Sequence, residues 1–146
     1  MKADLRAWVN GFEVPRGVGV DLVSVSQLRE LDEAVDGALV LRTFTAAERA
    51  EAAQEREPWV YLAGRFAAKE AVFKALDHLL GGGHFDFRQV ETLRRPDGSP
   101  AITTSGAMTD ILDRAGVEQL LVSLSNEGDF AIALVMATAN CTKADK

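Results

Sequence analysis

The longest helical pattern in the chain, residues 59–80, restricts the fold more than any other segment. At about 100° per residue, its large apolar side chains gather on one side of the helix and its small residues on the other. A helix that is apolar or small nearly all round is usually buried. Three consecutive glycines, residues 81–83, end the pattern. We therefore expect a buried helix whose charged residues do not form a solvated face.

The charged residues of this helix include Arg65, Lys69, Glu70 and Lys74. In the ordinary interpretation, Glu70 pairs with Lys74 four residues later, and Arg65 and Lys69 extend to the surface. The alternative is a ligand site, because three cations and one acid suit a polyphosphate with a divalent metal. Mg²⁺ takes one or two carboxylates and completes its shell with phosphate oxygens and water. The residues of the helix alone leave both interpretations open.

A second unusual acid, Asp21, lies in the segment GVGVDLV, within a predicted strand at residues 18–25. Asp is depleted in strands, and a buried carboxylate must be paired or must hold a metal. The ordinary alternative is an Asp at a bulge or strand end that is hydrogen-bonded to the backbone. Asp21 and Glu70 are therefore candidates for the two carboxylates of a metal site.

Strand and helix patterns alternate along the rest of the chain, with turn signals between strands. This order predicts a single compact α+β domain, with an antiparallel sheet packed on helices. The other predicted elements are a helix at 26–36 capped by Ser24 or Ser26, a helix from the Thr45–Glu48 capping box to about Glu57, strands at 89–94 and 101–104, a helix at 106–115, and strands at 120–124 and 130–137.

Length and composition exclude several classes of protein. A chain of 146 residues fits one domain, which we place at residues 17–138, after a leader or linker at 1–16 and before a polar tail at 139–146. The net charge of −6 and the lack of a basic tract argue against nucleic-acid binding. No apolar run is long enough for a signal peptide or a membrane span. A single cysteine, Cys141, fits a cytoplasmic protein.

Five segments occur in an order that resembles a known family. They are GVGVDLVSV, FTAAER, LAGRFAAKEAVFKAL, RRPDGSP and VSLSNEGDFAIALV. Together they are similar to the holo-acyl-carrier-protein synthases, the small 4'-phosphopantetheinyl transferases, over roughly Gly17 to Met136. The resemblance implies the 4'-phosphopantetheinyl transferase fold and a homotrimer that binds coenzyme A between neighbouring chains. The apolar run at 130–136, which needs covering on both faces, also favours association.

The resemblance assigns roles to the residues already singled out. It implies that Asp21 and Glu70 hold Mg²⁺, with Mn²⁺ as a possible substitute, and that Lys74 contacts the pyrophosphate of coenzyme A. Arg65 is expected near the nucleotide, where Lys69 adds positive charge. Residues after VSLS are expected to contact coenzyme A from the neighbouring chain, which makes Ser125 and Asn126 binding candidates. Asp21, Glu70 and Lys74 are the expected catalytic residues.

The implied activity is Mg²⁺-dependent transfer of 4'-phosphopantetheine from coenzyme A to a serine of an acyl or peptidyl carrier protein, as in fatty-acid or polyketide biosynthesis. Adenosine 3',5'-bisphosphate is released, and the general base is either a metal-bound water or Glu70. Asn126 stands where the family usually has His and removes a base. It favours an alternative, a coenzyme A-binding module with lost or weak activity. A purely structural trimerisation domain is a third possibility.

A second departure concerns the partner. Gln27 stands where the family commonly has Arg, in a helix that docks acidic carriers. Residues 26–42 carry more acids than bases. This predicts a less acidic carrier, such as a megasynthase carrier domain, or apolar contacts through Leu28, Leu31 and Leu39.

Overall fold

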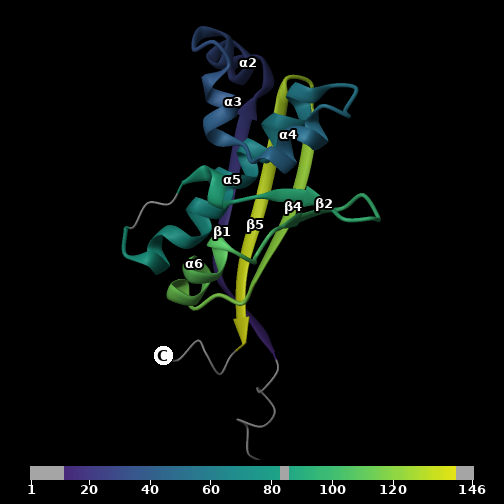
Figure 1. Cartoon of the computed structure of the whole chain (residues 1–146). Coiled ribbons are helices and arrows are strands. Elements are labelled where there is room, and N and C mark those ends of the chain that lie inside the picture. Colours follow the sequence, from purple (N-terminus) through teal and green to yellow (C-terminus); the bar gives the residue numbers. More distant parts are fainter. Residues whose placement is uncertain (1–11, 83–85, 141–146) are drawn as a thin grey trace, which may run out of the picture.

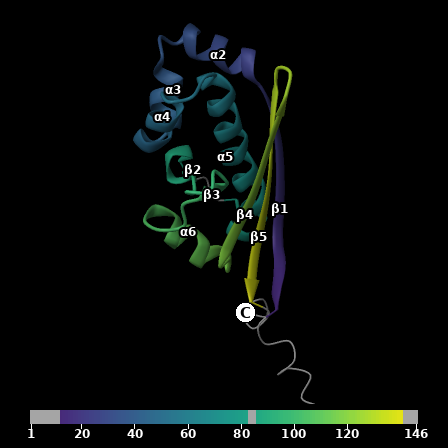
Figure 2. The same cartoon turned by 90° about the vertical axis from the view of Figure 1, so that its right-hand side faces the viewer.

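The computed structural model describes residues 12–82 and 86–140 and has two layers. An antiparallel sheet with the order β1–β5–β4 forms one layer, and helices cover one of its faces (Figures 1 and 2). The three strands are β1 (Glu13–Ser24), β4 (Gln119–Glu127) and β5 (Phe130–Asn140). A small second sheet pairs β2 (Thr92–Arg94) with β3 (Pro100–Ile102). The predicted α+β class with an antiparallel sheet is confirmed.

The remaining elements are helices. They are α2 (Val25–Ala34), α3 (Ala38–Thr43), α4 (Ala46–Ala52), α5 (Pro58–Leu80), the 3₁₀ turn η1 (Phe87–Gln89) and α6 (Ala107–Ala115). None of the helices in the described part of the chain is long and apolar enough to cross a membrane.

Helix α5 is the buried helix predicted from residues 59–80. Pro58 opens it, where a missing N–H costs nothing, and Gly81 ends it in the left-handed conformation with φ 67°. It lies between the sheet and the other helices, and most of its residues are buried (Figure 2). Its alanines and valine form the centre of the main core. Helix α5 therefore sets the position of every element that packs on it.

Strand β1 packs unusually closely on α5 because of two glycines. A Cβ on Gly17 would lie 1.9 Å from the carbonyl oxygen of Ala75, and one on Gly19 would lie 1.9 Å from that of Ala71. Any side chain at these positions would collide with helix backbone. Side chains alternate along a strand, so Asp21 faces the same way as these glycines. The close approach therefore brings Asp21 against α5.

The helices between β1 and α5 differ from the prediction in detail. Ser24 caps α2, and the capping box of Thr45 and Glu48 opens α4, both as predicted. Helix α4 ends at Ala52 instead of continuing to about Glu57. Helix α3 was not predicted, because its six residues are too few to show a helical period.

The strand pair β1–β5 extends beyond the predicted domain boundaries. Glu13 pairs with Asn140 and Val14 with Ala139, so residues assigned to the leader and to the tail continue the sheet. Cys141 lies outside the described residues.

The outer face of the sheet carries large apolar side chains that no other described residue covers. Inward residues of β5 such as Ala133 and Val135 are fully buried, whereas the alternating outward residues are exposed. The exposed outward side chains are Val18, Val20, Leu22, Leu121, Phe130, Ile132 and Leu134. The run at 130–136 is thus apolar on both faces, as predicted.

Candidate active site

A carboxylate–lysine cluster, formed by Asp21, Glu70 and Lys74, lies where β1 meets α5. The ammonium nitrogen of Lys74 donates to Oδ1 of Asp21 at 2.9 Å and to the carbonyl oxygen of Val20 at 3.0 Å. The ion pair of Lys74 therefore joins α5 to β1, whereas the ordinary interpretation kept it within the helix. The side chain of Asp21 is 17% exposed and that of Lys74 is 49% exposed, so the cluster is open to solvent.

The two carboxylates of this cluster interact unfavourably. Burial raises the pKa of Glu70, and the negative charge of Asp21 raises it further, while Lys74 opposes both effects. A divalent cation would relieve this repulsion, so the donor set fits a hard metal ion. No group of three or more His, Cys, Asp or Glu side chains in residues 12–82 and 86–140 is arranged to hold a metal ion. A metal held here would need its other ligands from substrate and water.

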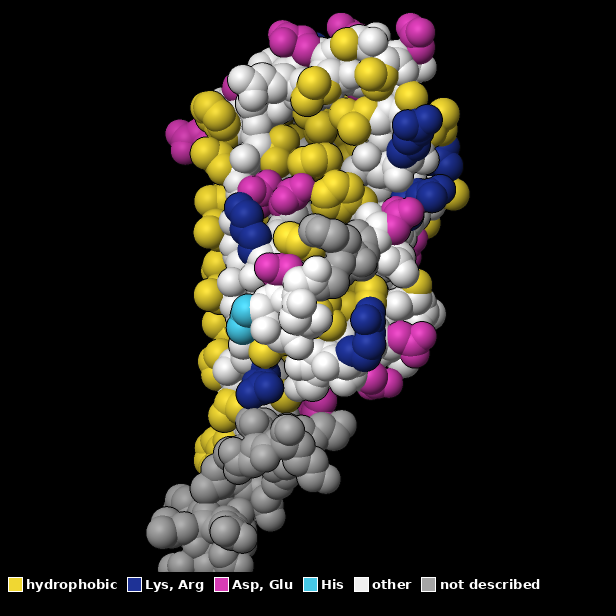
Figure 3. Space-filling view, turned by 90° about the vertical axis from the view of Figure 1, so that its left-hand side faces the viewer, with side chains coloured by type: hydrophobic (Ala, Val, Ile, Leu, Met, Phe, Trp, Pro, Cys, Tyr) yellow, Lys and Arg dark blue, Asp and Glu magenta, His cyan; other side chains and the backbone are white. Residues whose placement is uncertain are grey.

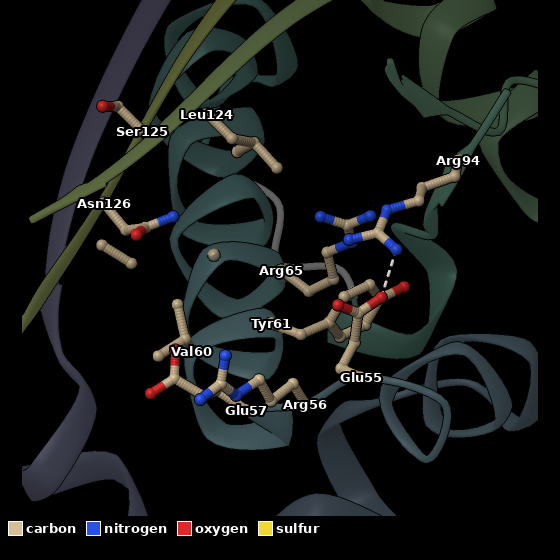
Figure 4. Close-up of a pocket in the computed structure, with 12 residues that line it drawn as sticks. Glu55, Arg56, Glu57, Val60, Tyr61, Arg65, Arg94, Leu124, Ser125 and Asn126 are labelled. Carbon is tan, nitrogen blue, oxygen red and sulfur yellow. Dashed lines mark hydrogen bonds and ion pairs between the residues drawn. The ribbon is translucent and has the colours of Figure 1, made fainter. Parts of the chain in front are cut away.

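A pocket of about 260 Å³ lies on the other side of α5 (Figure 4). The guanidinium groups of Arg65 on α5 and Arg94 on β2 lie together on one side of it, and Asn126 on β4 lies on the other. The residues that line it are Glu55, Arg56, Glu57, Val60, Tyr61, Gly64, Arg65, Arg94, Leu124, Ser125, Asn126 and Ala131. The arginines make this pocket a candidate for an anionic group.

Arg65 is held in place by contacts on several elements. Its guanidinium carbon lies 4.0 Å from the ring centroid of Tyr61, and its Nε donates to the carbonyl oxygen of Thr92 at 3.1 Å. Its Nη2 lies 3.7 Å from Oε2 of Glu51. This Nη2 is buried and makes no hydrogen bond to the described residues. Arg65 therefore has one donor that the described residues leave unsatisfied, next to the carboxylate of Glu51.

Sequence reasoning missed the residues that surround Arg65. Burial, and then the hydrogen bond that its hydroxyl donates to Glu51, raise the pKa of Tyr61. Arg94 pairs with Glu55. The sequence offered one signal for Arg94: two consecutive arginines, Arg94 and Arg95, precede a Pro-Asp-Gly turn in a chain of net negative charge.

Ser125 and Asn126 point in opposite directions. Neighbouring strand residues face opposite sides of a sheet. Asn126 directs its amide toward α5, whereas the hydroxyl of Ser125 points away from the pocket (Figure 4). Ser125 is exposed and pairs with Ile132, which belongs to the outer apolar face. Ser125 therefore lines this pocket without directing its hydroxyl into it, and its role toward coenzyme A stays a prediction.

Lys69, predicted to contact coenzyme A, reaches neither group of residues. Its side chain is completely buried and pairs with Glu48 at 2.8 Å. It also donates to the carbonyl oxygens of Phe87, at 2.9 Å, and Val90. Burial lowers the pKa of Lys69, and the carboxylate of Glu48 opposes that shift. We assign Lys69 to the core and leave it out of the site.

The cluster and the pocket lie at opposite edges of the sheet. Asp21 is on β1 and Asn126 on β4, with β5 between them. Arg65 and Lys74 are nine residues apart on α5, which places them roughly 180° apart around the helix. The chain by itself therefore does not bring its two groups of candidate residues together.

Comparisons with known proteins identify the class of protein that has this fold and these residues. The sequence profile of the 4'-phosphopantetheinyl transferase superfamily matches residues 17–135. The chain belongs to this superfamily, which confirms the family and the enzyme class that the sequence predicted.

Individual relatives agree with this assignment. The holo-[acyl-carrier-protein] synthase of Desulforudis audaxviator is 42% identical over 121 residues, which are 83% of this chain and 91% of that protein. The crystal structure of the Neisseria meningitidis synthase matches with a TM-score of 0.75 at 32% identity, over 85% of this chain and 98% of that one. A Chronobacterium ammoniagenes ACPS–CoA complex matches with a TM-score of 0.72 at 31% identity, over 84% and 96% of the two chains.

Proposed function

We propose that this chain is a holo-[acyl-carrier-protein] synthase, which transfers the 4'-phosphopantetheine group of coenzyme A to a serine of a carrier protein. The observation that carries the proposal is the carboxylate–lysine cluster. In this cluster two acids disfavour each other's charge, and the ammonium group of Lys74 beside them is half exposed. The fold is shared with a relative whose structure is a complex with coenzyme A. The partner would be an acyl or peptidyl carrier protein.

The transfer breaks the bond between the two phosphates of coenzyme A. The serine hydroxyl attacks the β-phosphate, its oxygen forms the new P–O bond, and adenosine 3',5'-bisphosphate leaves. Charge spreads over the phosphoryl oxygens in the transition state, so positioned cations supply most of the catalysis. Lys74, half exposed and already hydrogen-bonded in the cluster, would contact these oxygens. The proton of the serine hydroxyl would pass to Glu70 or to a metal-bound water.

Asp21 and Glu70 would hold the metal. Mg²⁺ bound there, or Mn²⁺ in its place, would neutralise charge on the pyrophosphate. Because two carboxylates are too few ligands for Mg²⁺, we expect metal and coenzyme A to bind cooperatively. Isothermal titration of coenzyme A with and without Mg²⁺ measures this coupling, and equal affinities under both conditions would contradict it.

We propose further that the complete site forms between copies of the chain in a homotrimer. Two observations support this: the cluster and the pocket lie at opposite edges of the sheet, and the outer sheet face is apolar and is left uncovered by residues 12–82 and 86–140. In such an assembly, Arg65 and Asn126 of one copy would bind the nucleotide while Asp21, Glu70 and Lys74 of the next hold the pyrophosphate. Sedimentation should give a trimer, and an active monomer at micromolar concentration would overturn it.

Mixing two inactive variants tests the shared site directly. Asp21→Asn damages only the cluster, and Arg65→Gln damages only the pocket. When the two are unfolded and refolded together, random assembly should give roughly a quarter of the sites both intact halves. Recovered activity supports a site between copies. If the mixture stays as inactive as each variant alone, both halves belong to one chain.

The transfer itself is tested by mass spectrometry of carrier proteins after incubation with coenzyme A and Mg²⁺. We expect the mass of phosphopantetheine to be added to the carrier, and the addition to stop when a chelator removes the metal. No addition to any carrier, at any carrier concentration, would overturn the proposed function.

One residue favours a second candidate, a coenzyme A-binding module with weak transfer. Asn126 in the pocket offers an amide, which neither carries charge nor acts as a base at neutral pH. The substitution Asn126→His distinguishes the two candidates. It should raise turnover markedly only if the present chain is a weakened enzyme. For either candidate we propose a cytoplasmic location, which the single cysteine favours.

A further inference from the structure

The tip of the β4–β5 hairpin lies beside the point where β1 turns into α2. Gly128 and Asp129 form a two-residue turn, since Glu127 still pairs with Phe130. Phe130 also pairs with Ser24, the last residue of β1. Both strand ladders therefore end at Phe130, and the turn lies beyond them, next to the first residues of α2.

Asp129 caps the first turn of α2 from outside the helix. Its backbone carbonyl accepts from the N–H of Val25 at 2.7 Å, and its Oδ1 accepts from the N–H of Ser26 at 2.9 Å. The hydroxyl of Ser24 accepts from the next N–H, that of Gln27. Three of the N–H groups that a helix leaves free in its first turn thus have acceptors.

The same carboxylate also binds two serine hydroxyls. Oδ2 of Asp129 accepts from Oγ of Ser24 and from Oγ of Ser26, each at 2.6 Å. These hydrogen bonds lower the pKa of Asp129, so its carboxylate is charged at neutral pH. The partners are 103 or 105 positions apart in the sequence, so these contacts, which we call the Asp129 clamp, join two distant segments.

The Asp129 clamp lies close to Asn126, which is three residues earlier in the hairpin. Asn126 lines the pocket around Arg65 and directs its amide toward α5 (Figure 4). It pairs with Ala131, one pair from the end of the β4–β5 ladder. Residues 125–130 are all exposed, so packing does little to hold this part of the hairpin. Hydrogen bonds to α2 therefore fix its position.

Asp21 depends less on the clamp, although β1 carries it toward Ser24. It lies in the middle of the β1–β5 ladder, opposite Ala133, and Lys74 binds it from α5. Loss of the clamp should therefore disturb the pocket and leave the carboxylate–lysine cluster in place.

Helix α2 is a firm support for the hairpin because its inner side packs in the core. Leu28 was expected to contact the partner, but it is 3% exposed and packs beside Phe44. Leu39 is partly buried against the same core, whereas Leu31 is exposed as predicted. The prediction failed for Leu28 because it is on the inward side of α2. A turn bonded to α2 is thereby fixed to the core.

We propose, on the basis of the proposed transferase function, that Asp129 is a positioning residue for coenzyme A. By joining the hairpin to α2, it holds the amide of Asn126 toward the pocket and does not contact the ligand itself. The sign of its charge separates this role from an electrostatic one. Coenzyme A is an anion, and acidic side chains already stand at the end of the molecule where α2 lies (Figure 3). Removing an acid would by charge alone strengthen binding, whereas losing the clamp weakens it.

The test measures coenzyme A binding by isothermal titration with Mg²⁺, together with the steady-state constants of transfer. Asp129→Ala should raise Kd and KM for coenzyme A roughly five- to tenfold, the effect of about one lost hydrogen bond. Turnover at saturation should change less than about twofold. Asp129→Asn should bind nearly as well as the unchanged protein, because an amide can accept from the N–H of Ser26 and donate to the serine hydroxyls.

A double-mutant cycle separates positioning from a general loosening of the fold. If Asp129 acts through Asn126, Asp129→Ala should add nothing to the weaker binding of Asn126→Ala. Additive losses in the double variant would overturn the proposal, and so would equal affinities of Asp129→Ala and the unchanged protein.

Asp86→Ala is the matched control. Asp86 is also an exposed carboxylate at the start of a helical turn, η1, and accepts from the N–H of Arg88 at 2.8 Å. The change removes the same charge and the same kind of cap, and the Kd of coenzyme A should stay nearly the same. A loss as large as that of Asp129→Ala would overturn the positioning role. Each of these results leaves the transferase function standing, whereas failure of the unchanged protein to bind coenzyme A removes both.

Discussion

Two lysines of helix α5 form ion pairs that differ in burial. Lys69 pairs with Glu48 in the core, where both side chains are completely buried. Lys74, five residues later, pairs with Asp21 near the surface, where both remain partly exposed. Both lysines lie in a helix whose sequence shows no solvated face. The difference between them comes from what packs on each side of α5.

The pairs Lys69–Glu48 and Lys74–Asp21 differ in how completely their hydrogen bonds and charges are satisfied. Lys69 has a carboxylate and two carbonyl oxygens as acceptors, and Glu48 also accepts from the N–H groups of Thr45 and Thr92. This closed network joins α4, α5 and β2. In the other pair, Asp21 has Glu70 as a second acid nearby, so the cluster has an excess of negative charge and access to solvent. Complete satisfaction indicates a structural role, and unbalanced charge at an open surface indicates a ligand.

The largest expected effect is on stability, at the buried pair. Lys69→Met leaves the carboxylate of Glu48 in the core without its cation, which should cost about 3–5 kcal/mol of unfolding free energy. Urea denaturation measures this loss. The double variant Lys69→Met with Glu48→Gln removes the unpaired charge and should recover part of it. A single variant as stable as the unchanged protein would contradict the structural role of this pair.

The next effect is on catalysis, at the open cluster. Asp21→Asn should lower kcat by ~10²–10³ with little change in unfolding free energy, because it removes a charge that acts on the transition state. Asp113→Asn on α6 serves as the control and should leave both quantities unchanged. Equal turnover in Asp21→Asn and the control would refute the assignment of the cluster.

Because the pKa of Glu70 is raised, the stability difference between the unchanged protein and Glu70→Gln should depend on pH. An acid whose folded pKa is raised stabilises the fold below its unfolded pKa, and that contribution disappears as pH rises through the folded pKa. Without metal, Glu70→Gln should therefore be at least as stable as the unchanged protein at neutral pH. Its advantage should vanish in acid, as thermal unfolding across pH would reveal. A Gln variant that is less stable at neutral pH would contradict the unfavourable burial of Glu70.

A smaller effect is expected where β1 approaches α5. Gly19→Ala places a Cβ against the carbonyl oxygen of Ala71 and should cost about 1–3 kcal/mol, as overpacking usually does. It should also reduce turnover, because the shifted strand carries Asp21. Gly64→Ala is the control: its Cβ would meet only Leu124 at 3.9 Å, so the change should be neutral or stabilising in a helix. Equal stabilities of the two variants would disprove the close approach.

The smallest effect concerns the helix cap that supports Glu48. Thr45→Ala removes the hydroxyl that accepts from the N–H of Glu48 and should cost about 1 kcal/mol. Thr104→Ala, at an exposed position, should change the melting temperature much less. A loss as large as that of Lys69→Met would mean that the cap, and not the ion pair, holds α4 in place.

Local patterns in the sequence were enough to predict most of the helices and strands and to single out Asp21 and Glu70 as metal-binding candidates. The buried helix, its glycine stop and the capping box of Thr45 each depend on residues close together in the chain. Asp21 and Glu70 were conspicuous because acids rarely occur in buried segments. The ordered set of five motifs then predicted the family, which the comparisons confirmed.

Only the tertiary structure separated the two lysines of α5 and revealed the pocket around Arg65. The partners of Lys69 are Glu48, Phe87 and Val90, far from it along the chain, and no periodicity within a helix predicts them. The same holds for Glu51 and Arg94, which lie near Arg65 because α4, α5 and β2 pack together. Tyr61 differs, because it lies four residues before Arg65 on α5 and helical spacing alone brings the two together. Whether a charge is buried or open depends on desolvation by distant segments, and that is settled by packing and not by local sequence.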